Sequence, residues 1–281
     1  MKKAIILMTV ICTSFNFCGC GKEERYEDTV TLVTREEGSG TREAFSEILN
    51  ITDKYGADAI SDSAEVTNST SVMLQSIADD VNAIGYVSLG SLPKTVKALS
   101  VDGVKITETN IKNGRYKIFR KFLICRRPDI SNRLEDDLVS FILSNEGQKI
   151  VSEKGFVSFD GRGHYSPAFL KGKITMAGST SVSPAAEALY EEYEKLNPGT
   201  EFEIQQTGSA AGISAAIDGI SDLGLSSRPL KGDEKDKLTE TEIALDGIAV
   251  IVNKKNRIDN LSAKTIKNLF EGKITRWSEI K

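Results

Sequence analysis

The feature that most constrains the fold is a repeated order of elements: a short apolar run, a glycine-serine turn and then a helix. It occurs at residues 38–41 (Gly-Ser-Gly-Thr), 178–181 (Gly-Ser-Thr-Ser) and 208–209 (Gly-Ser). In each case a strand-like apolar run precedes the turn, and apolar residues at helical spacing follow it. Because strands alternate with helices along the whole chain, we predict an α/β fold.

The same three turns have the chemistry of an oxyanion site. Glycine lets the backbone approach a ligand closely, and the first turn of a helix leaves N–H groups without intrahelical acceptors. These groups and the helix dipole favour an anion, and serine and threonine hydroxyls add further donors. Arg35 lies just before the first turn, and one guanidinium can contact two oxygens of an anion. A single serine of this kind is usually only a helix N-cap, whereas three turns and an arginine favour oxyanion binding.

Several motifs resemble those of the phosphate-binding proteins of phosphate-specific ABC transporters. The resemblance covers nearly all of residues 30–160 and 173–281. It implies a periplasmic-binding-protein-like fold of type II, in which a ligand cleft separates two α/β lobes. The motifs are TREEGSGTR (34–42), NAIGYVSLG (82–90), EGQKI (146–150), GSTSVSP (178–184), GS (208–209), DLGLSSRP (222–229) and GKITRW (272–277).

The two matching segments stand in the opposite order from the family, in which the segment resembling 173–281 comes first. The resemblance therefore implies a circularly permuted fold, which is physically reasonable where the former ends lay close together at the surface. We expect one lobe from residues 30–116 and 245–281, and the other from 117–244, which contains a linker at 159–172 joining the family's former ends. A swapped dimer, or a rearranged gene whose product folds poorly, would also account for the order.

The resemblance also implies which residues form the site. Arg35 would pair with the anion, and Glu37 would orient Arg35. Some family members carry an aspartate that accepts the proton of hydrogen phosphate where this chain has Ser227. A serine can accept a hydrogen bond but adds no charge, which weakens the rejection of sulfate. The phosphate-binding residues implied in this way are Arg35, Ser39, Gly40, Thr41, Thr180, Ser181, Ser209 and Ser227.

Composition argues against other classes of function. The formal net charge of -4 does not suggest a nucleic-acid partner, which would call for a basic surface. A hydrolase would need an activated nucleophile with a base, or metal ions, yet the single histidine, His164, lies outside every candidate turn. We therefore expect a binding protein and not an enzyme, with no cofactor and no metal site.

The N-terminus resembles a bacterial lipoprotein signal. A basic start at residues 1–3 and an apolar stretch at 4–17 lead to Cys20, which a small residue precedes. We expect residues 1–20 to be a signal peptide ending at lipidated Cys20, followed by a tether at 21–29. An ordinary signal peptide that contains cysteines is the alternative, and Cys125 is the one cysteine further along the chain.

Together these features predict a lipid-anchored protein outside the cytoplasmic membrane, with the membrane reached through its anchor. Its partners would be inorganic phosphate and the permease subunits of an ABC transporter. A binding protein for another tetrahedral oxyanion, or a phosphate-sensing lipoprotein not coupled to transport, remains the alternative.

Overall fold

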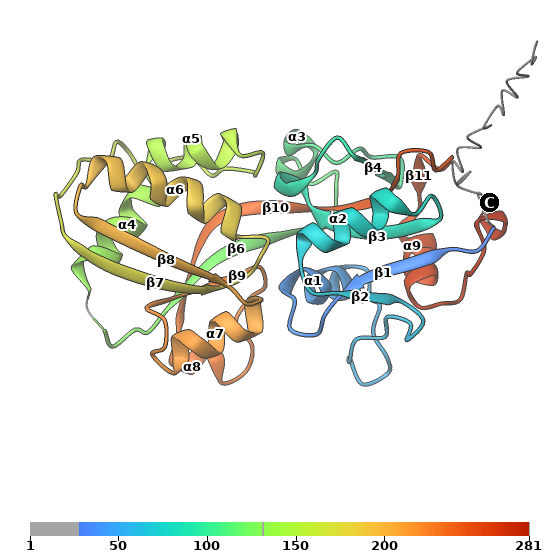
Figure 1. Ribbon diagram of the computed structural model, residues 1–281, viewed down its shortest axis with the longest axis horizontal. Helices are drawn as coiled ribbons and strands as arrows, with labels where there is room; N and C mark the ends of the chain where they lie inside the picture. The colour runs from blue at the N-terminus through green and yellow to red at the C-terminus, as the bar shows by residue number, and fades with distance from the viewer. Residues whose placement is uncertain (1–27, 131, 281) are drawn as a thin grey trace, which may run out of the picture.

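The computed structural model describes residues 28–130 and 132–280. Two lobes lie side by side and are joined by two long strands, β6 (Phe119–Arg126) and β10 (Thr239–Asn253) (Figure 1). Lobe A contains the elements from β1 to α3 and from β11 onward, and lobe B contains those from α4 to α8. Among the described residues, no helix combines the length and the apolar character needed to cross a bilayer.

Lobe A is built around parallel strands that are covered on both faces. β1 pairs with β2 on one side and with β3 on the other, and β3 is buried along its whole length. Phe45, Tyr86 and Phe270 pack together on one face, while Met73 and Ile77 of α2 cover the other. The main elements are β1 (Thr31–Arg35), α1 (Gly40–Ile48), β2 (Glu65–Thr67), α2 (Thr70–Asp79), β3 (Ala83–Ser88) and α9 (Ala263–Phe270).

Lobe B has its own hydrophobic core around β7, which lies between β8 and β9 and runs parallel to both. Helix α7 sits tightly against the end of β7, since a Cβ at Gly212 would lie 2.4 Å from the carbonyl oxygen of Ala177. The elements are α4 (Arg133–Ile142), α5 (Asn145–Glu153), β7 (Gly172–Gly178), α6 (Ser183–Leu196), β8 (Thr200–Gln206), α7 (Ser209–Ile217), β9 (Leu223–Ser226) and α8 (Glu234–Lys237).

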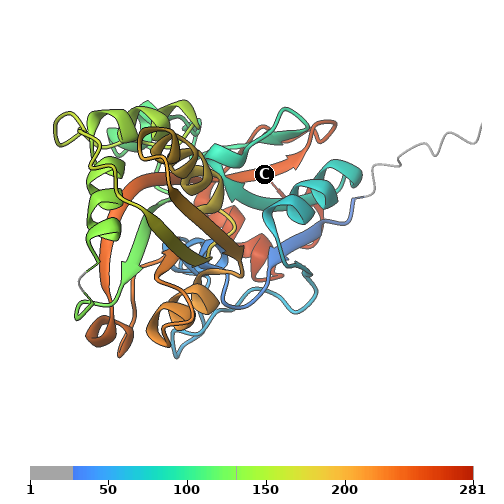
Figure 2. The ribbon, with the colours of Figure 1, turned by 60° about the vertical axis from the view of Figure 1, so that its left-hand side comes forward.

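The strand β10 makes one continuous sheet of the two lobes. Its first part pairs antiparallel with β6, and its second part pairs with β3 and β4 (Val96–Ala98), so the sheet order is β2-β1-β3-β10-β6-β9-β7-β8. Figure 2 shows β6 and β10 passing together from one lobe to the other. We call this pair of crossing strands the hinge.

A buried ion pair lies within the hinge. The guanidinium of Arg120 donates to Asp246 Oδ2 through Nε at 3.1 Å and Nη2 at 3.0 Å, and the Ser88 hydroxyl donates to Oδ1 at 2.7 Å. Burial raises the pKa of Asp246, and the adjacent guanidinium opposes that shift. These contacts tie the end of β3 to both crossing strands.

Both ends of the described chain lie in lobe A. The Trp277 N–H donates to the Asp28 carbonyl at 2.7 Å, and Thr29 forms an antiparallel bridge with Arg276. The last residues of the expected tether therefore pair with the C-terminal segment. The remaining short elements are η1 (Leu89–Ser91), β5 (Ser100–Val101), α3 (Glu108–Lys112), β11 (Asn260–Leu261) and η2 (Trp277–Glu279).

The predicted α/β fold with two lobes is confirmed. The expected signal peptide, Cys20 and residues 21–27 of the tether lie outside the described residues. The lobe boundaries and the permuted order remain predictions.

Candidate functional site

The eight predicted anion-binding residues lie at element ends where the two lobes meet. In lobe A, Arg35 ends β1, and Ser39, Gly40 and Thr41 begin α1. In lobe B, Thr180 and Ser181 link β7 to α6, Ser209 begins α7 and Ser227 follows β9. All of these residues are buried except Thr180, which is half-buried.

Arg35 is held in place from two sides. Its side chain is 3% exposed and forms a two-pronged ion pair with Glu36, from Nε to Oε2 and from Nη2 to Oε1, each at 2.8 Å. Its backbone N–H donates to the Tyr86 hydroxyl at 3.2 Å, and that hydroxyl lies 2.7 Å from Thr34 Oγ1. Burial raises the pKa of Tyr86 to about 12, so its hydroxyl stays protonated at neutral pH.

The carboxylate that orients Arg35 is therefore that of Glu36 and not that of Glu37, which corrects the sequence-based expectation. Residues 36–39 form a tight turn, closed by a hydrogen bond from Ser39 N–H to the Glu36 carbonyl, with Gly38 at φ +80°. Glu37 occupies a central position of this turn and is exposed. Glu36 still takes part in the hydrogen bonding between β1 and β2, because its N–H donates to the Thr67 carbonyl.

At Gly40 the backbone of lobe A lies close to side chains of lobe B. A Cβ at this position would lie 2.4 Å from Ser209 Oγ and 2.5 Å from Ser227 Oγ. Ser39 is the N-cap of α1 and accepts a long hydrogen bond, 3.5 Å, from the Arg42 N–H. The N–H groups of Gly40 and Thr41, at the start of α1, thus stand beside two serine hydroxyls of the other lobe.

The hydroxyls of lobe B form a connected cluster. Ser209 Oγ accepts from the Ser227 N–H at 3.1 Å and lies 3.2 Å from Ser227 Oγ, which also accepts from Ser179 Oγ at 3.0 Å. Ser209 and Ser227 are completely buried. No carboxylate takes part in these hydrogen bonds, so this side of the site offers hydroxyls and backbone N–H groups.

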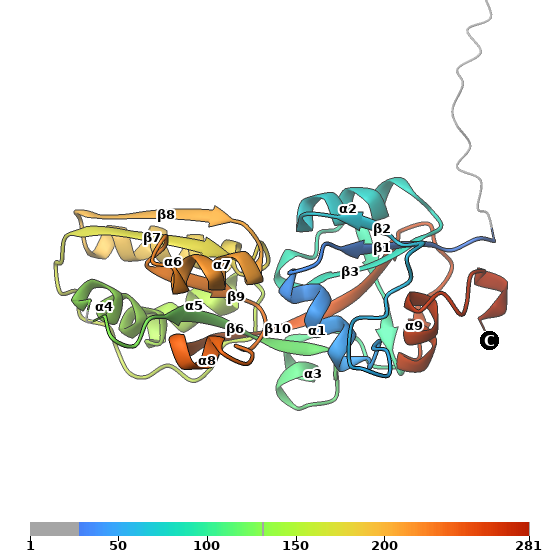
Figure 3. The same ribbon diagram turned by 90° about the horizontal axis from the view of Figure 1, so that it is seen from below.

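Hydrogen bonds link the lobes directly at the candidate site. Thr41 Oγ1 lies 2.9 Å from Ser181 Oγ, Arg35 Nη2 donates to Thr180 Oγ1 at 3.3 Å, and the Ala210 N–H donates to the Gly38 carbonyl at 3.2 Å. Figure 3 shows α1 and α7 approaching each other at the junction of the lobes. The lobes are in contact at the candidate site itself.

An inter-lobe ion-pair cluster lies beside these hydrogen bonds. It joins Glu43 and Glu47 of α1 to Arg228 and Lys231 of lobe B, with Lys231 Nζ 2.8 Å from each glutamate and Arg228 Nε 2.9 Å from Glu43. Arg228 also pairs with Glu234 of its own lobe at 2.7 Å. Burial alone would lower the pKa of Lys231, but hydrogen bonds to the two glutamates raise it.

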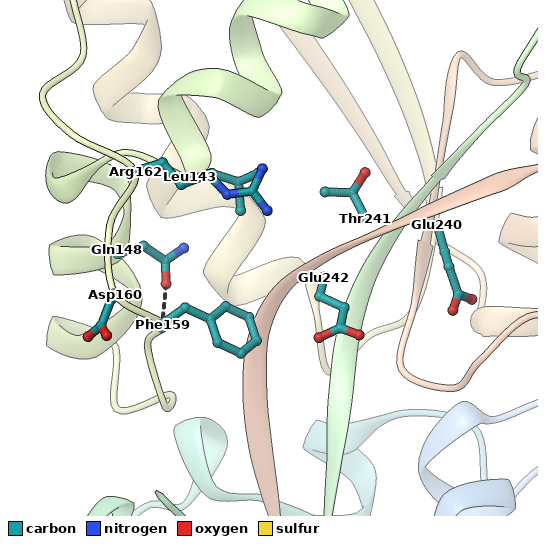
Figure 4. A pocket seen from close by; sticks show the side chains of 8 residues that line it. All are labelled: Leu143, Gln148, Phe159, Asp160, Arg162, Glu240, Thr241 and Glu242. Atoms are coloured by element: carbon teal, nitrogen blue, oxygen red, sulfur yellow. Dashed lines mark hydrogen bonds between the residues drawn. The ribbon is translucent and has the colours of Figure 1, made fainter.

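A separate cavity of about 440 Å³ lies in lobe B, between the segment around residues 159–162 and β10 (Figure 4). It contains none of the predicted anion-binding residues. Three carboxylates, those of Asp160, Glu240 and Glu242, and one guanidinium, that of Arg162, line it, so the net charge of its lining is negative and disfavours an anion. Among the described residues, no group of three or more His, Cys, Asp or Glu side chains could hold a metal ion.

Sequence reasoning missed three residues of the site. Glu36 directly follows Arg35, and only the turn geometry distinguishes it from Glu37. Ser179 stands in the predicted turn but was not among the proposed ligands, although its hydroxyl contacts Ser227. Thr70, at the start of α2, lies 3.5 Å from Arg35 Nη1 and 3.4 Å from Thr180 Oγ1. No glycine precedes Thr70, so the turn pattern did not reveal it.

Comparison with known proteins agrees with this geometry. The family described as "PBP superfamily domain" matches residues 25–146 and 164–280. The phosphate-binding protein PstS 2 of Streptococcus agalactiae is 44% identical over 268 residues, 94% of this chain and 92% of the relative. That of Streptococcus pneumoniae serotype 4 is 39% identical over 289 residues, 100% of this chain and 99% of the relative.

The crystal structure of a phosphate ABC transporter phosphate-binding protein from S. pneumoniae TIGR4 superposes with a TM-score of 0.73 at 41% identity, covering 90% of this chain and 100% of that one. The chain therefore belongs to the PBP superfamily, in the family of these phosphate-binding proteins.

Proposed function

We propose that this protein binds inorganic phosphate outside the cytoplasmic membrane and delivers it to an ABC transporter. The observation that carries the proposal is the convergence of Arg35 with hydroxyls and helix N-terminal N–H groups from both lobes in one buried site. Such a site supplies donors on several sides of a tetrahedral oxyanion, and the low local dielectric strengthens each of them. The names of the relatives give the same ligand and the same transport system.

Capture would proceed by closure of the two lobes on the anion. Arg35, Ser39, Gly40 and Thr41 approach from lobe A, and Thr180, Ser181, Ser209 and Ser227 approach from lobe B. The hinge strands β6 and β10 are the elements that cross between the lobes, so a change in their twist would move one lobe against the other. Release to permease subunits of the transporter would then require the lobes to reopen.

We propose a binding role and not an enzymatic one. Arg35 and Glu36 form an orienting ion pair, which supplies neither a nucleophile nor a general base. The single histidine, His164, has a side chain that is 83% exposed and pairs with Glu146 in lobe B. Hydroxyls without an adjacent base suit the binding of an oxyanion and not the attack on one.

The anchor is part of the same proposal. Lipidation of Cys20 would hold the protein at the outer face of the cytoplasmic membrane. We expect Cys20→Ser to release the protein from the membrane fraction into the medium or periplasm while leaving phosphate binding intact. Retention of the variant in the membrane would contradict lipidation at this residue.

We also propose that the halves stand in circularly permuted order in a monomer. Hydrogen bonds between the two ends of the described chain, at Asp28 and Trp277, support this, because a permutation leaves its new ends adjacent. The segment 159–172 stays on lobe B, where the Tyr165 hydroxyl donates to Asp137 Oδ2 at 2.5 Å. Gel filtration with light scattering should give a monomer. A chain that restores the family's order, with residue 281 joined to residue 28 and its ends in the segment 159–172, should bind phosphate equally well. A dimer would favour the swapped assembly instead.

Isothermal titration calorimetry on the chain from residue 21 to 281 tests phosphate binding. We expect a single site per chain and saturation with inorganic phosphate at neutral pH. A folded sample that gives no heat and no thermal stabilisation with phosphate would overturn the proposal. Thermal stabilisation by another tetrahedral oxyanion alone would identify that anion as the ligand.

Selectivity against sulfate should be weak. Hydrogen phosphate and sulfate are both dianions at neutral pH and differ by a proton, and the buried hydroxyl cluster around Ser227 contains no carboxylate to accept that proton. We expect sulfate to displace phosphate with an affinity within about a hundredfold of that of phosphate, since one charged hydrogen bond contributes about 1.5–3 kcal/mol. Failure of millimolar sulfate to compete in the titration would show that another group accepts the proton of hydrogen phosphate.

The inter-lobe ion-pair cluster should contribute to affinity. In Lys231→Glu a carboxylate would face Glu43 and Glu47, which disfavours closure, so we expect phosphate affinity to fall about fivefold at low salt. Lys235→Glu on α8 makes the same change in net charge and is the matched control. Because salt screens such charges, the difference between the two variants should shrink at about 1 M salt. Equal affinities of both variants at low salt would contradict this role.

A further inference from the structure

We propose that Thr70, at the first position of α2, donates its hydroxyl to the bound oxyanion and so makes α2 a fourth wall of the site. The inference rests on the proposed function and extends it, because α2 belongs to none of the three glycine-serine turns. The observation behind it is the set of hydrogen bonds that the N–H groups of the Arg35 guanidinium donate.

One edge of the Arg35 guanidinium is occupied and the other faces two threonines. Glu36 takes the edge formed by Nε and Nη2, with both contacts at 2.8 Å. On the other edge, Nη2 donates to Thr180 Oγ1 at 3.3 Å and Nη1 donates to Thr70 Oγ1 at 3.5 Å. An oxyanion that replaces these two long contacts with a two-pronged pairing would lie between Thr70 and Thr180.

The direction of these hydrogen bonds fixes what Thr70 can offer. Arginine has no acceptor, so the Thr70 oxygen must accept from Arg35, and its own hydroxyl hydrogen is left to point elsewhere. Thr180 Oγ1, 3.4 Å away, also accepts from Arg35, and in the structure one of these two hydroxyls donates to the other. A hydroxyl that accepts from a cation is a stronger donor, and an anion beside the two threonines would receive a hydrogen bond from each.

The start of α2 adds backbone donors on the same side. Ser69 is the N-cap, and its hydroxyl accepts from the Val72 N–H at 3.2 Å, which leaves the N–H groups of Thr70 and Ser71 without an acceptor inside the helix. Ser69, Thr70, Ser71 and Thr180 also line a cavity of about 330 Å³, so this end of α2 is accessible to an anion. The helix has ten residues, and its dipole favours negative charge at this end.

Calorimetry with inorganic phosphate on three variants tests the assignment. Thr70→Val keeps the shape and removes the hydroxyl, and we expect phosphate affinity to fall about tenfold or more. Thr70→Ser keeps a hydroxyl and should bind within about threefold of the parent. Gln75→Ala changes an exposed residue of the same helix that does not line the cavity, and it should bind as the parent does. Melting temperatures establish that all three variants fold.

A double-mutant cycle separates a ligand from a residue that only positions Arg35. In an Arg35→Lys background, Thr70→Val should still weaken phosphate binding severalfold if Thr70 contacts the anion. Loss of the effect in that background would overturn the proposal and leave Thr70 as a positioning residue. Parent-like affinity of Thr70→Val in the normal background would also overturn it, with phosphate binding by the parent unaffected. A parent that does not bind phosphate would overturn both this inference and the proposed function.

Discussion

Replacement of Arg35 by methionine is expected to weaken phosphate binding by about a hundredfold or more. Methionine keeps much of the packing volume but removes the buried guanidinium that donates to Thr180. Truncating one partner of a buried, hydrogen-bonded charge pair costs about 2–5 kcal/mol, and each 1.4 kcal/mol is about tenfold in affinity. The carboxylate of Glu36 would also lose its partner and would face the anion uncompensated. Titration calorimetry measures the loss directly.

Two other substitutions give this experiment its controls. Arg35→Lys retains the charge without the planar fork, so its affinity should lie between those of the parent and Arg35→Met. Arg42→Met removes a nearby cation that instead pairs with Asp58 and the Arg35 carbonyl, and its affinity should stay within about fivefold of the parent. If Arg35→Met bound phosphate as tightly as Arg42→Met, Arg35 would not be a ligand.

Gly40→Ala is expected to weaken phosphate binding by about tenfold to a hundredfold without destabilising the fold. The added Cβ would stand 2.4 Å from Ser209 Oγ and 2.5 Å from Ser227 Oγ, so either the lobes stay further apart or both serines move away from the anion. Overpacking of this kind costs about 1–3 kcal/mol. Alanine itself suits the start of a helix, so the melting temperature without phosphate should not fall.

The measurement for Gly40→Ala combines calorimetry with small-angle X-ray scattering. The parent should become more compact when phosphate is added, and the variant should show a smaller change. Thr41→Ser, at the next position, keeps the hydroxyl that contacts Ser181 and should behave as the parent. Unchanged affinity in Gly40→Ala would show that the close approach of the lobes at this point is not needed for binding.

The sequence allowed the site to be predicted where local chemistry determines structure. Glycine-serine turns after apolar runs placed Ser39, Thr180 and Ser209 at the ends of strands, and the structure brings these ends together. The pairing of Arg35 was predicted with the wrong neighbour because the turn at Gly38, and not the spacing, decides which glutamate faces the guanidinium. Thr70 could not be found from a turn pattern, since it meets Arg35 only through the packing of α2 against β1.

The hinge and the inter-lobe ion-pair cluster could not be predicted from the sequence, for a different reason. The first half of β10, residues 239–247, begins with four polar residues and ends with Asp246 and Gly247, so it lacks the apolar pattern of a buried strand. Asp246 is tolerated there because Arg120 lies opposite it in the strand pairing. Lys231 and Glu43 are separated by 188 positions in the chain, and no local pattern connects them.

The meeting of the two chain ends in lobe A has a mechanical consequence. Because residues 28–29 are hydrogen-bonded to residues 276–277, a pull applied through the N-terminus acts on lobe A alone and puts no load on β6 or β10. Lobe B can then rotate about the hinge relative to lobe A, which is held at the point of attachment. A protein fixed to a surface in this way would open and close with the same energy whether its attachment is slack or taut.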